Sequence, residues 1–228
     1  MKKSKIKLVL FDYDGVIVDP IYNVTAWKNA CASFNFFIDD NDWYINEGLK
    51  PEEISLFFLK KYKIKNVTVE ELVSEKNKQY KILLKKNNKV ELYNNVCSIL
   101  SFLKKKGIRI GLVTGSTLLR VTNSIPEIKD FFDVMVTADS LDENNKIVSD
   151  KRFSTPWLFA AKKLNIPVNE CIVIENASLG VNSAKKAGMF CIAIQTTLSK
   201  ELLKEADLVI KDHKQLFSYL KKMLNKYE

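Results

Sequence analysis

The sequence predicts an α/β fold in which a doubly wound, Rossmann-like parallel sheet carries an inserted α-helical cap domain. The chain has 228 residues, which exceeds one typical domain of about 100–200 residues without filling two. From residue 94 onward, short apolar runs alternate with helical segments, a pattern typical of a parallel sheet covered on both faces. Between the first apolar run and residue 88, the sequence shows only helical spacing.

The first strand is predicted at residues 6–11, a short apolar run that ends in the turn sequence Asp-Tyr-Asp-Gly. The block that follows is predicted to hold helices at 21–34, 52–62 and 69–86. Pro51 precedes the second of them, as expected for a proline in a first helical turn. Because the first strand has the same apolar texture as the later strands, we interpret the helical block as an insertion after strand one.

The rest of the chain is predicted to build the sheet and its covering helices. Helices are expected to stop at Gly107 and Gly188, where glycine favours a helix end. The predicted strands are 108–113, 132–137, 171–174, 190–194 and 208–210, and the predicted helices are 96–106, 117–124, 155–164, 179–187 and 212–226. The expected domains are therefore a core of residues 1–18 and 89–228 and a cap of residues 19–88.

The composition excludes several classes of site. His213 is the only histidine, so metal sites that need two histidines are excluded. The four cysteines (Cys31, Cys97, Cys171 and Cys191) form no C-x-x-C pair, which argues against a zinc ribbon or a redox motif. Such scattered cysteines are typical of reduced, buried thiols in a cytoplasmic protein.

The net charge of +9 comes almost entirely from lysines spread along the chain. Direct base readout and bidentate phosphate contacts favour arginine, so we expect solvated helix faces and no nucleic-acid partner. The apolar stretch near the N-terminus is cut short by Asp12 and Asp14. No stretch approaches the roughly 20 apolar residues of a membrane span, so we expect no membrane association and a cytoplasmic location.

Polar clusters follow the first, second and fourth predicted strands. They are Asp12 and Asp14, residues 114–116, and residues 175–176, while Lys151 lies in the loop after the third strand. In open parallel sheets, ligands bind at the carboxyl ends of the strands. We therefore expect acids, hydroxyl and amide groups and one ammonium to surround a single point.

Four segments resemble, in order, the motifs of the haloacid dehalogenase-type hydrolases, in the branch with a helical cap after strand one. They are residues 11–16, 113–116, 151–164, and 174–181 followed by 187–189. The resemblance runs from strand one to about residue 195, and each motif follows a separately predicted strand. It implies a Mg²⁺-dependent phosphatase that hydrolyses a small organic phosphate monoester through an aspartyl-phosphate intermediate.

By this resemblance, Asp12 is the nucleophile and Asp14 is the general acid and base. Phosphoryl transfer requires an in-line nucleophile and neutralisation of the spreading charge. Side chains alternate between the two faces with a period of two only while a strand persists. The strand breaks at Gly15, so both can reach one pocket. The alternative is that the two aspartates only initiate a turn.

The second and third motifs are expected to bind the phosphate. Thr114, Gly115 and Ser116 would hold its oxygens, with the glycine allowing close approach of the backbone. The alternative for this Thr-Gly-Ser segment is a helix-capping turn. Lys151 would neutralise the phosphate, and Lys146 is the alternative for that role.

Mg²⁺ is the expected cofactor, since it prefers oxygen ligands. The resemblance implies ligands from the Asp12 carboxylate, the Asp14 backbone carbonyl, and Glu175 and Asn176 of the fourth motif. The family usually has aspartate where Asn176 stands. The amide removes one negative charge, so metal affinity is expected to fall, or Glu175 to contribute more. The alternatives are that residues 175–176 only cap a helix, or that the protein is a non-catalytic binding module.

The cap resembles that of β-phosphoglucomutases at residues 22–28, but it departs from them. Asn23 replaces an expected histidine, and Pro51 stands in place of an arginine for the non-transferred phosphate. The second motif also lacks the Ala-rich form found in the mutases. These departures favour a phosphatase, with a sugar phosphomutase as the alternative.

Three cap residues, Lys50, Lys76 and Asn77, are expected to contact the substrate. A lysine there would act as a point charge, without the fork of an arginine. The expected partner is a small phosphorylated metabolite, and the expected assembly is a monomer or a weak homodimer. A dehalogenase is disfavoured, because carbon–halogen cleavage does not use the acid and base that Asp14 supplies.

Overall fold

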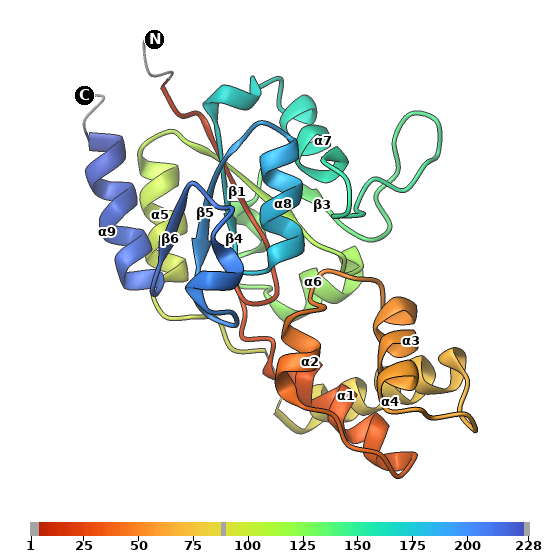
Figure 1. The fold of residues 1–228 in the computed structure, drawn as a ribbon. Coiled ribbons are helices and arrows are strands. Elements are labelled where there is room, and N and C mark those ends of the chain that lie inside the picture. The colour runs from red at the N-terminus through yellow and green to blue at the C-terminus, as the bar shows by residue number, and fades with distance from the viewer. Residues whose placement is uncertain (1–4, 88–89, 226–228) are drawn as a thin grey trace.

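A six-stranded parallel sheet forms the centre of the computed structural model, which describes residues 5–87 and 90–225 (Figure 1). The strand order is β3-β2-β1-β4-β5-β6, so the chain starts in the middle of the sheet and extends to both edges. This is the doubly wound α/β fold predicted from the sequence. The strands are β1 Leu8–Phe11, β2 Arg109–Val113, β3 Val134–Val136, β4 Cys171–Glu175, β5 Phe190–Ile194 and β6 Leu208–Ile210.

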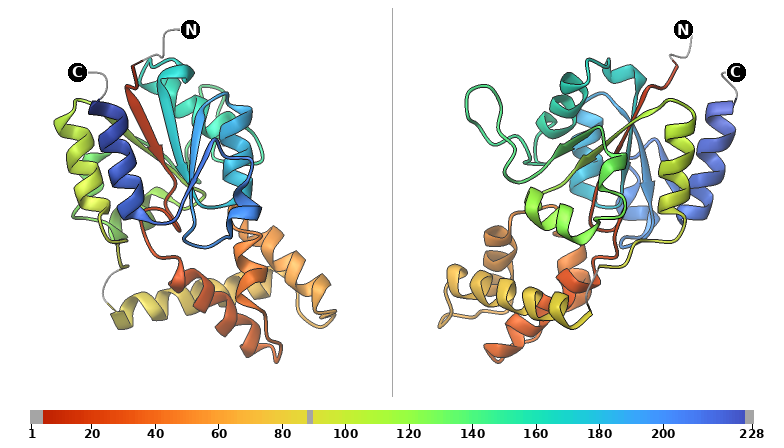
Figure 2. Two further views of the ribbon diagram at one scale, coloured as in Figure 1. Left: turned by 60° about the vertical axis from the view of Figure 1, so that its left-hand side comes forward. Right: turned by 180° about the vertical axis from the view of Figure 1, so that it is seen from behind.

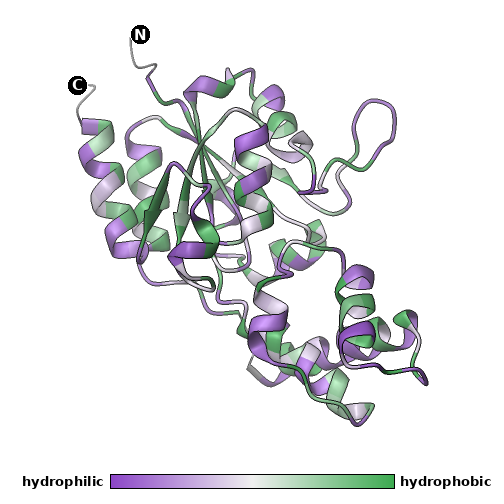
Figure 3. Ribbon diagram, in the orientation of Figure 1, coloured by the Kyte–Doolittle hydropathy of each residue, from purple (hydrophilic) through white to green (hydrophobic). Residues whose placement is uncertain are grey.

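The central strand β1 is buried along its whole length between β2 and β4. Parallel strands covered on both faces read as continuous apolar runs, because both sides of the pleat meet a helix layer. Figure 3 shows this contrast, with hydrophobic strands inside and hydrophilic surfaces on the outer helices. Helices α5 (Val96–Lys105) and α9 (His213–Leu224) cover one face, and α7 (Thr155–Lys163) and α8 (Ser178–Lys186) cover the other (Figure 2).

A separate helical unit follows β1 and lies beyond the carboxyl ends of the strands (Figure 1). It has its own hydrophobic core, in which the Trp27 and Phe58 rings meet edge to face. The two chain connections to the sheet run side by side, with an antiparallel bridge between Val18 and Leu92. The helices of this unit are α1 Ile21–Ser33, α2 Asp40–Tyr44, α3 Pro51–Lys61 and α4 Val69–Asn87.

Most predicted elements are present with ends shifted by a few residues, but α2 was not predicted. It has only five residues, and it begins where the side chain of Asp39 accepts a hydrogen bond from the Asn41 amide at 2.8 Å. A single turn is too short to show helical periodicity in a sequence. The expected domain boundary between residues 88 and 89, and the expected helix end at 226, lie outside the described residues.

The remaining elements are short. Helix α6 (Leu118–Ser124) follows β2, and three 3₁₀ turns occur at Lys129–Phe131, Val168–Glu170 and Lys200–Leu203. His213 is buried at the start of α9, where its Nε2 donates to the Val16 carbonyl at 2.7 Å and its ring stacks on Tyr93. The histidine therefore ties α9 to the loop after β1. Within the described ranges, no helix is both long and apolar enough to cross a membrane.

Candidate active site

A cavity of about 100 Å³ lies where the carboxyl ends of β1, β2 and β4 face the helical unit. Both units contribute to its wall, so the cavity exists only where they meet. The sheet side supplies Asp12, Asp14, Thr114, Gly115, Ser116, Arg120, Lys151, Glu175 and Ala177, and the helical unit supplies Asn23, Trp27, Trp43, Glu47, Gly48, Leu49, Pro51, Ile54 and Lys76.

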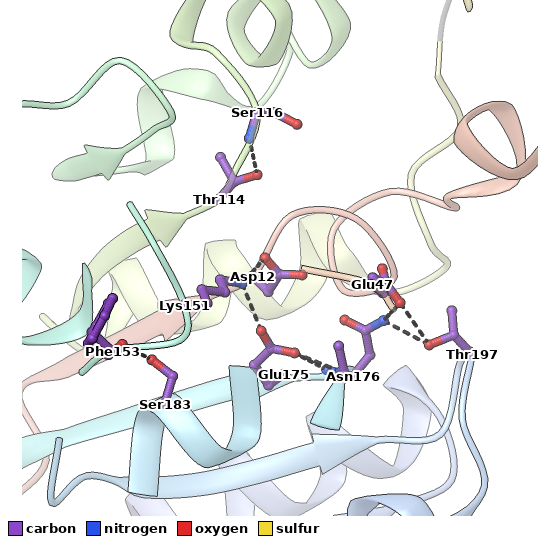
Figure 4. Close-up of polar contacts among 11 residues, drawn as sticks. Asp12, Glu47, Thr114, Ser116, Lys151, Phe153, Glu175, Asn176, Ser183 and Thr197 are labelled. Atoms are coloured by element: carbon purple, nitrogen blue, oxygen red, sulfur yellow. Dashed lines mark hydrogen bonds and ion pairs between the residues drawn. The ribbon is translucent and has the colours of Figure 1, made fainter. Parts of the chain in front are cut away.

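Asp12 comes directly after β1 and is buried beside Lys151 (Figure 4). The lysine ammonium donates to Asp12 Oδ1 and, at 2.7 Å, to Glu175 Oε1. Burial raises the pKa of Asp12 above its ordinary value, and the Lys151 ammonium opposes this shift. Burial acts to lower the pKa of Lys151, but the two carboxylates raise it, so this lysine remains charged. The three side chains form a buried charged cluster at the centre of the sheet edge.

Lys151 is held in place by the loop before α7. The Ser183 hydroxyl of α8 donates to the Phe153 carbonyl in that loop (Figure 4), and the Lys151 ammonium lies 5.0 Å from the centre of the Trp157 ring. By contrast, Lys146 is exposed in the preceding loop and is not among the residues lining the cavity. The structure therefore places Lys151, and not Lys146, at the Asp12 carboxylate.

Glu175 ends β4 with both carboxylate oxygens engaged inside the protein. One oxygen accepts from Lys151, and the other accepts from the backbone amides of Asn176 and Ala177 at 2.7 and 2.8 Å. The carboxylate thus satisfies amides at the start of α8, where a negative charge is favoured. Both oxygens of Glu175 therefore have protein partners. The side-chain oxygen of residues 175–176 that has none is Asn176 Oδ1.

The Asn176 amide is fully buried, and its nitrogen and oxygen have different surroundings. Nδ2 donates to Glu47 Oε2 and to Thr197 Oγ1, both at 2.8 Å, whereas Oδ1 has no protein partner. Figure 4 shows the amide nitrogen on the side of Glu47 and Thr197. Gly15 makes this packing feasible, since it has φ +80° and a Cβ there would lie 2.0 Å from Asn176 Nδ2.

The donor set around Asn176 fits a hard cation such as Mg²⁺. An unpartnered buried oxygen is costly unless an ion or a water satisfies it, and Mg²⁺ takes oxygen ligands. The residues suited to hold the ion are Asp12, through its carboxylate, and Asn176, through its amide oxygen, with the Asp14 backbone carbonyl expected to join them. Among the described residues, no group of three or more His, Cys, Asp or Glu side chains is arranged to hold a metal. A site formed by the residues named above would combine the Asp12 carboxylate with neutral oxygen donors.

Asp14 carries two side-chain contacts across the cavity. Its Oδ1 accepts from Arg120 Nη2 at 3.3 Å and from Asn23 Nδ2 at 3.2 Å. Arg120 also donates from Nη1 to Ser116 Oγ at 2.6 Å and from Nε to Tyr80 Oη at 3.1 Å, with its guanidinium 4.5 Å from the centre of the Tyr80 ring. This arginine therefore joins Asp14, the turn after β2 and the helical unit.

Arg120 was missed in the sequence analysis, although the sequence carries a signal for it. It is one of three arginines in a lysine-rich chain and lies in the first turns of α6. A positive charge near a helix N-terminus is unfavourable, so an arginine there is expected to pair with an acidic or polar group outside its helix. Glu47 and Tyr80 were also missed, because their roles depend on contacts made by the folded helical unit.

The Thr114, Gly115 and Ser116 segment leaves β2 and lines the cavity. The Thr114 amide donates to the Val136 carbonyl of β3 at 2.8 Å, and Thr114 Oγ1 accepts from the Ser116 amide at 3.1 Å. The capping residue of α6 is instead Thr117, whose side chain accepts from the Arg120 amide. The segment is therefore a turn of its own, separate from the helix cap.

Of the three residues expected to contact substrate from the cap, only Lys76 lines the cavity. It is 7% exposed, and its ammonium lies 5.7 Å from the Trp27 ring centre and 5.3 Å from that of Tyr80. Burial, with a smaller contribution from Arg120, lowers the pKa of Lys76 to about 7. Lys50 and Asn77 have exposed side chains outside the cavity wall.

The chain is similar to known proteins over most of its length. A family model described as haloacid dehalogenase-like hydrolase matches residues 9–194. The chain is 28% identical over 219 residues to β-phosphoglucomutase of Bacillus subtilis (strain 168), covering 92% of this chain and 91% of that protein. It is 27% identical over 217 residues to hexitol phosphatase A of Escherichia coli (strain K12), covering 91% of each. The structure of β-phosphoglucomutase (pgmB) from Clostridium difficile superposes with a TM-score of 0.75 at 31% identity, covering 97% of this chain and 98% of that one.

Proposed function

Because the chain belongs to the haloacid dehalogenase-like hydrolases, and to their phosphatases and phosphomutases, we propose that it hydrolyses small organic phosphate monoesters with Mg²⁺ through an aspartyl-phosphate intermediate. The observation that carries the proposal is the buried Asp12 carboxylate. It is paired with Lys151 in a cavity that also holds Asp14 and the Thr114 turn. A nucleophile, a charge-neutralising cation, an acid and phosphate-binding donors therefore face one space.

In the first step, an Asp12 oxygen attacks phosphorus as the ester P–O bond breaks, and Asp14 donates a proton to the leaving oxygen. In the second step, Asp14 removes a proton from water, and the water oxygen attacks the phosphorus of the aspartyl-phosphate. Inorganic phosphate leaves and the Asp12 carboxylate is restored. A positioned acid and base of this kind contributes about 10²–10⁴-fold to rate.

Lys151 and the Thr114 turn stabilise charge during both steps. The Lys151 ammonium lies against Asp12 and compensates negative charge that moves onto the phosphoryl oxygens. When bound by Asp12, Asn176 and the Asp14 carbonyl, Mg²⁺ would add neutralisation of the phosphoryl group. Hydroxyl and amide donors of the Thr114 turn would bind the remaining oxygens.

The direct test is the Asp12→Asn variant, assayed for Mg²⁺-dependent release of phosphate from an aryl phosphate. The amide keeps the shape of the side chain but cannot act as the carboxylate nucleophile, so activity should be abolished. Asp130→Asn, at an exposed position away from the cavity, is the matched control and should retain activity. An Asp12→Asn enzyme with wild-type activity would show that the nucleophile is assigned wrongly.

A sugar phosphomutase is the second candidate, since β-phosphoglucomutases are among the relatives. Pro51 lines the cavity on the cap side and provides no cation for a non-transferred phosphate, which favours the phosphatase, while Lys76 is a cation that the cap does place in the wall. Mutase action predicts that β-glucose 1-phosphate, primed with the bisphosphate, is converted to the 6-phosphate. Hydrolysis predicts inorganic phosphate instead. Assays of sugar phosphates, phosphoglycolate and nucleotides would then define the substrate.

A further inference from the structure

Glu47 of the helical unit contacts the buried fourth-motif amide of the sheet domain. Its Oε2 accepts from Asn176 Nδ2 at 2.8 Å and from the Thr197 hydroxyl at 3.2 Å. The side chain is only 5% exposed, and its other oxygen, Oε1, has no protein partner. Burial, together with the nearby Asp12 and Asp14 carboxylates, raises the pKa of Glu47 well above its ordinary value, so a charge here is costly without a cation.

The contact dictates which way the Asn176 amide faces. Glu47 Oε2 accepts this hydrogen bond, so the amide group turned toward Glu47 is the nitrogen. The Thr197 hydroxyl completes a triangle, since it accepts from the same nitrogen and donates to Glu47. The Asn176 oxygen is consequently left on the opposite side, buried and unpartnered. In Figure 4 it lies on the side of the amide nearer Asp12.

Asn176 is neutral, so the oxygen that it offers brings no negative charge to a cation. The carboxylate hydrogen-bonded to its side chain comes from the cap, at a position 129 residues earlier in the chain. Carboxylates that hydrogen-bond a metal ligand commonly orient it and raise its affinity for the metal. The Glu47 carboxylate has the contact and the burial that this role requires, and a bound cation would favour its ionised form.

We propose that Glu47 is the positioning residue of the metal site, holding Asn176 with its oxygen toward the ion and supplying from the cap the negative charge that Asn176 lacks. The inference rests on the proposed function, in which Mg²⁺ binds at Asp12 and Asn176. It also links metal binding to the contact between the two units. Gly48, the next residue, is packed on α8, where an added Cβ would lie 3.3 Å from Leu179 Cδ2.

The test is calorimetric titration of the protein with Mg²⁺ alone, without substrate or turnover. Glu47→Gln keeps the shape and an acceptor oxygen but removes the charge, and it should weaken Mg²⁺ binding about 10–100-fold. Glu52→Gln makes the same change at an exposed position of the same unit and should bind like the wild type. The double variant Glu47→Gln/Asn176→Asp moves the charge from the cap to the ligand and should recover most of the affinity.

The single variant Asn176→Asp gives an independent readout in thermal unfolding. It places two carboxylates in contact, so without Mg²⁺ it should melt below the wild type, and Mg²⁺ should raise its melting temperature more than that of the wild type. Equal Mg²⁺ affinity of Glu47→Gln and wild type would overturn the inference and leave the proposed function intact. The same holds if the double variant binds no better than Glu47→Gln. A wild-type protein that binds no Mg²⁺ would remove the metal from the proposed function, and this inference with it.

Discussion

The guanidinium of Arg120 lies 3.3 Å from the carboxylate of Asp14, its Nη2 facing Oδ1, although the two residues are 106 positions apart in the chain. The same guanidinium binds the hydroxyls of Ser116 and Tyr80. A single planar guanidinium therefore contacts the candidate acid, a residue of the turn after β2 and a residue of the cap. A lysine at this position would keep the charge but could not span three directions.

Replacing Arg120 by lysine should therefore lower kcat/KM by about 10–100-fold, the effect of losing one or two hydrogen bonds to charged groups. Steady-state kinetics on the preferred phosphate ester measures this change. Arg109→Lys is the control, since Arg109 pairs with Asp133 at an exposed position outside the cavity wall. An Arg120→Lys enzyme as efficient as Arg109→Lys would show that Asp14 does not depend on this contact.

Lys151 is the only cation in direct contact with the Asp12 and Glu175 carboxylates within the described part of the chain. In a Lys151→Gln variant, two buried carboxylates would lose their counter-ion. The free energy of unfolding should then fall by about 3–5 kcal/mol, and phosphatase activity should be lost. Urea unfolding and phosphate release measure the two effects. Lys146→Gln, at the exposed alternative position, should change neither, and the reverse result would exchange the roles of the two lysines.

Lys76 is expected to make stability depend on pH. Burial lowers its pKa from 10.5 to about 7 in the folded protein, so between these values the unfolded chain holds the proton more tightly. The penalty for the buried ammonium is therefore fully present below pH 7 and disappears as the pH rises toward 10.5. Lys76→Met should raise the melting temperature more at pH 6 than at pH 9.

The control for Lys76 is Lys78→Met, two residues along the same helix, where the side chain is 67% exposed. Its effect on the melting temperature should be small and similar at both pH values. A Lys76→Met effect of equal size at pH 6 and pH 9 would contradict a lowered pKa of Lys76.

Gly15 is predicted to be required for folding of the site. With φ +80°, an alanine there costs about 1–2 kcal/mol in backbone energy, and its Cβ would meet Asn176 at 2.0 Å. Gly15→Ala should therefore lower the melting temperature by several degrees. Gly115→Ala is a sharp control, because a Cβ at Gly115 meets nothing within 4 Å and its φ is not positive. Similar melting temperatures for the two variants would contradict this explanation of Gly15.

Several site residues could be predicted from the sequence because they directly follow strands. Asp12, Thr114 and Glu175 each end or follow an apolar run, and parallel strands bring their carboxyl ends to one edge. The fold class could be predicted for the same reason, since alternation of strands and helices is a local pattern. Lys151 could be predicted only from its position relative to the rest of the third motif. The structure places its ammonium in contact with the Asp12 carboxylate.

Other site residues could not be predicted, because nothing local marks them. Glu47 lies in a turn after a five-residue helix, and its contact with Asn176 exists only when the helical unit rests on the sheet domain. Tyr80 looked like any buried aromatic on an amphipathic helix. Lys50 and Asn77 carry polar groups that could bind a substrate, and they are neighbours of Pro51 and Lys76 in the sequence. In the structure both side chains are exposed and lie outside the cavity wall.

The sequence by itself thus determined the doubly wound sheet, the helical insertion and the order of the polar motifs, because each depends on periodicity or on residues within a few positions. Only the tertiary structure decided how the charged and polar groups are paired: Lys151 between Asp12 and Glu175, Arg120 on Asp14, and Glu47 on Asn176. The physical reason is that electrostatic and hydrogen-bond partners are selected by distance in space and by exclusion of water. Both arise only when β1, β2, β4 and the cap meet around one cavity.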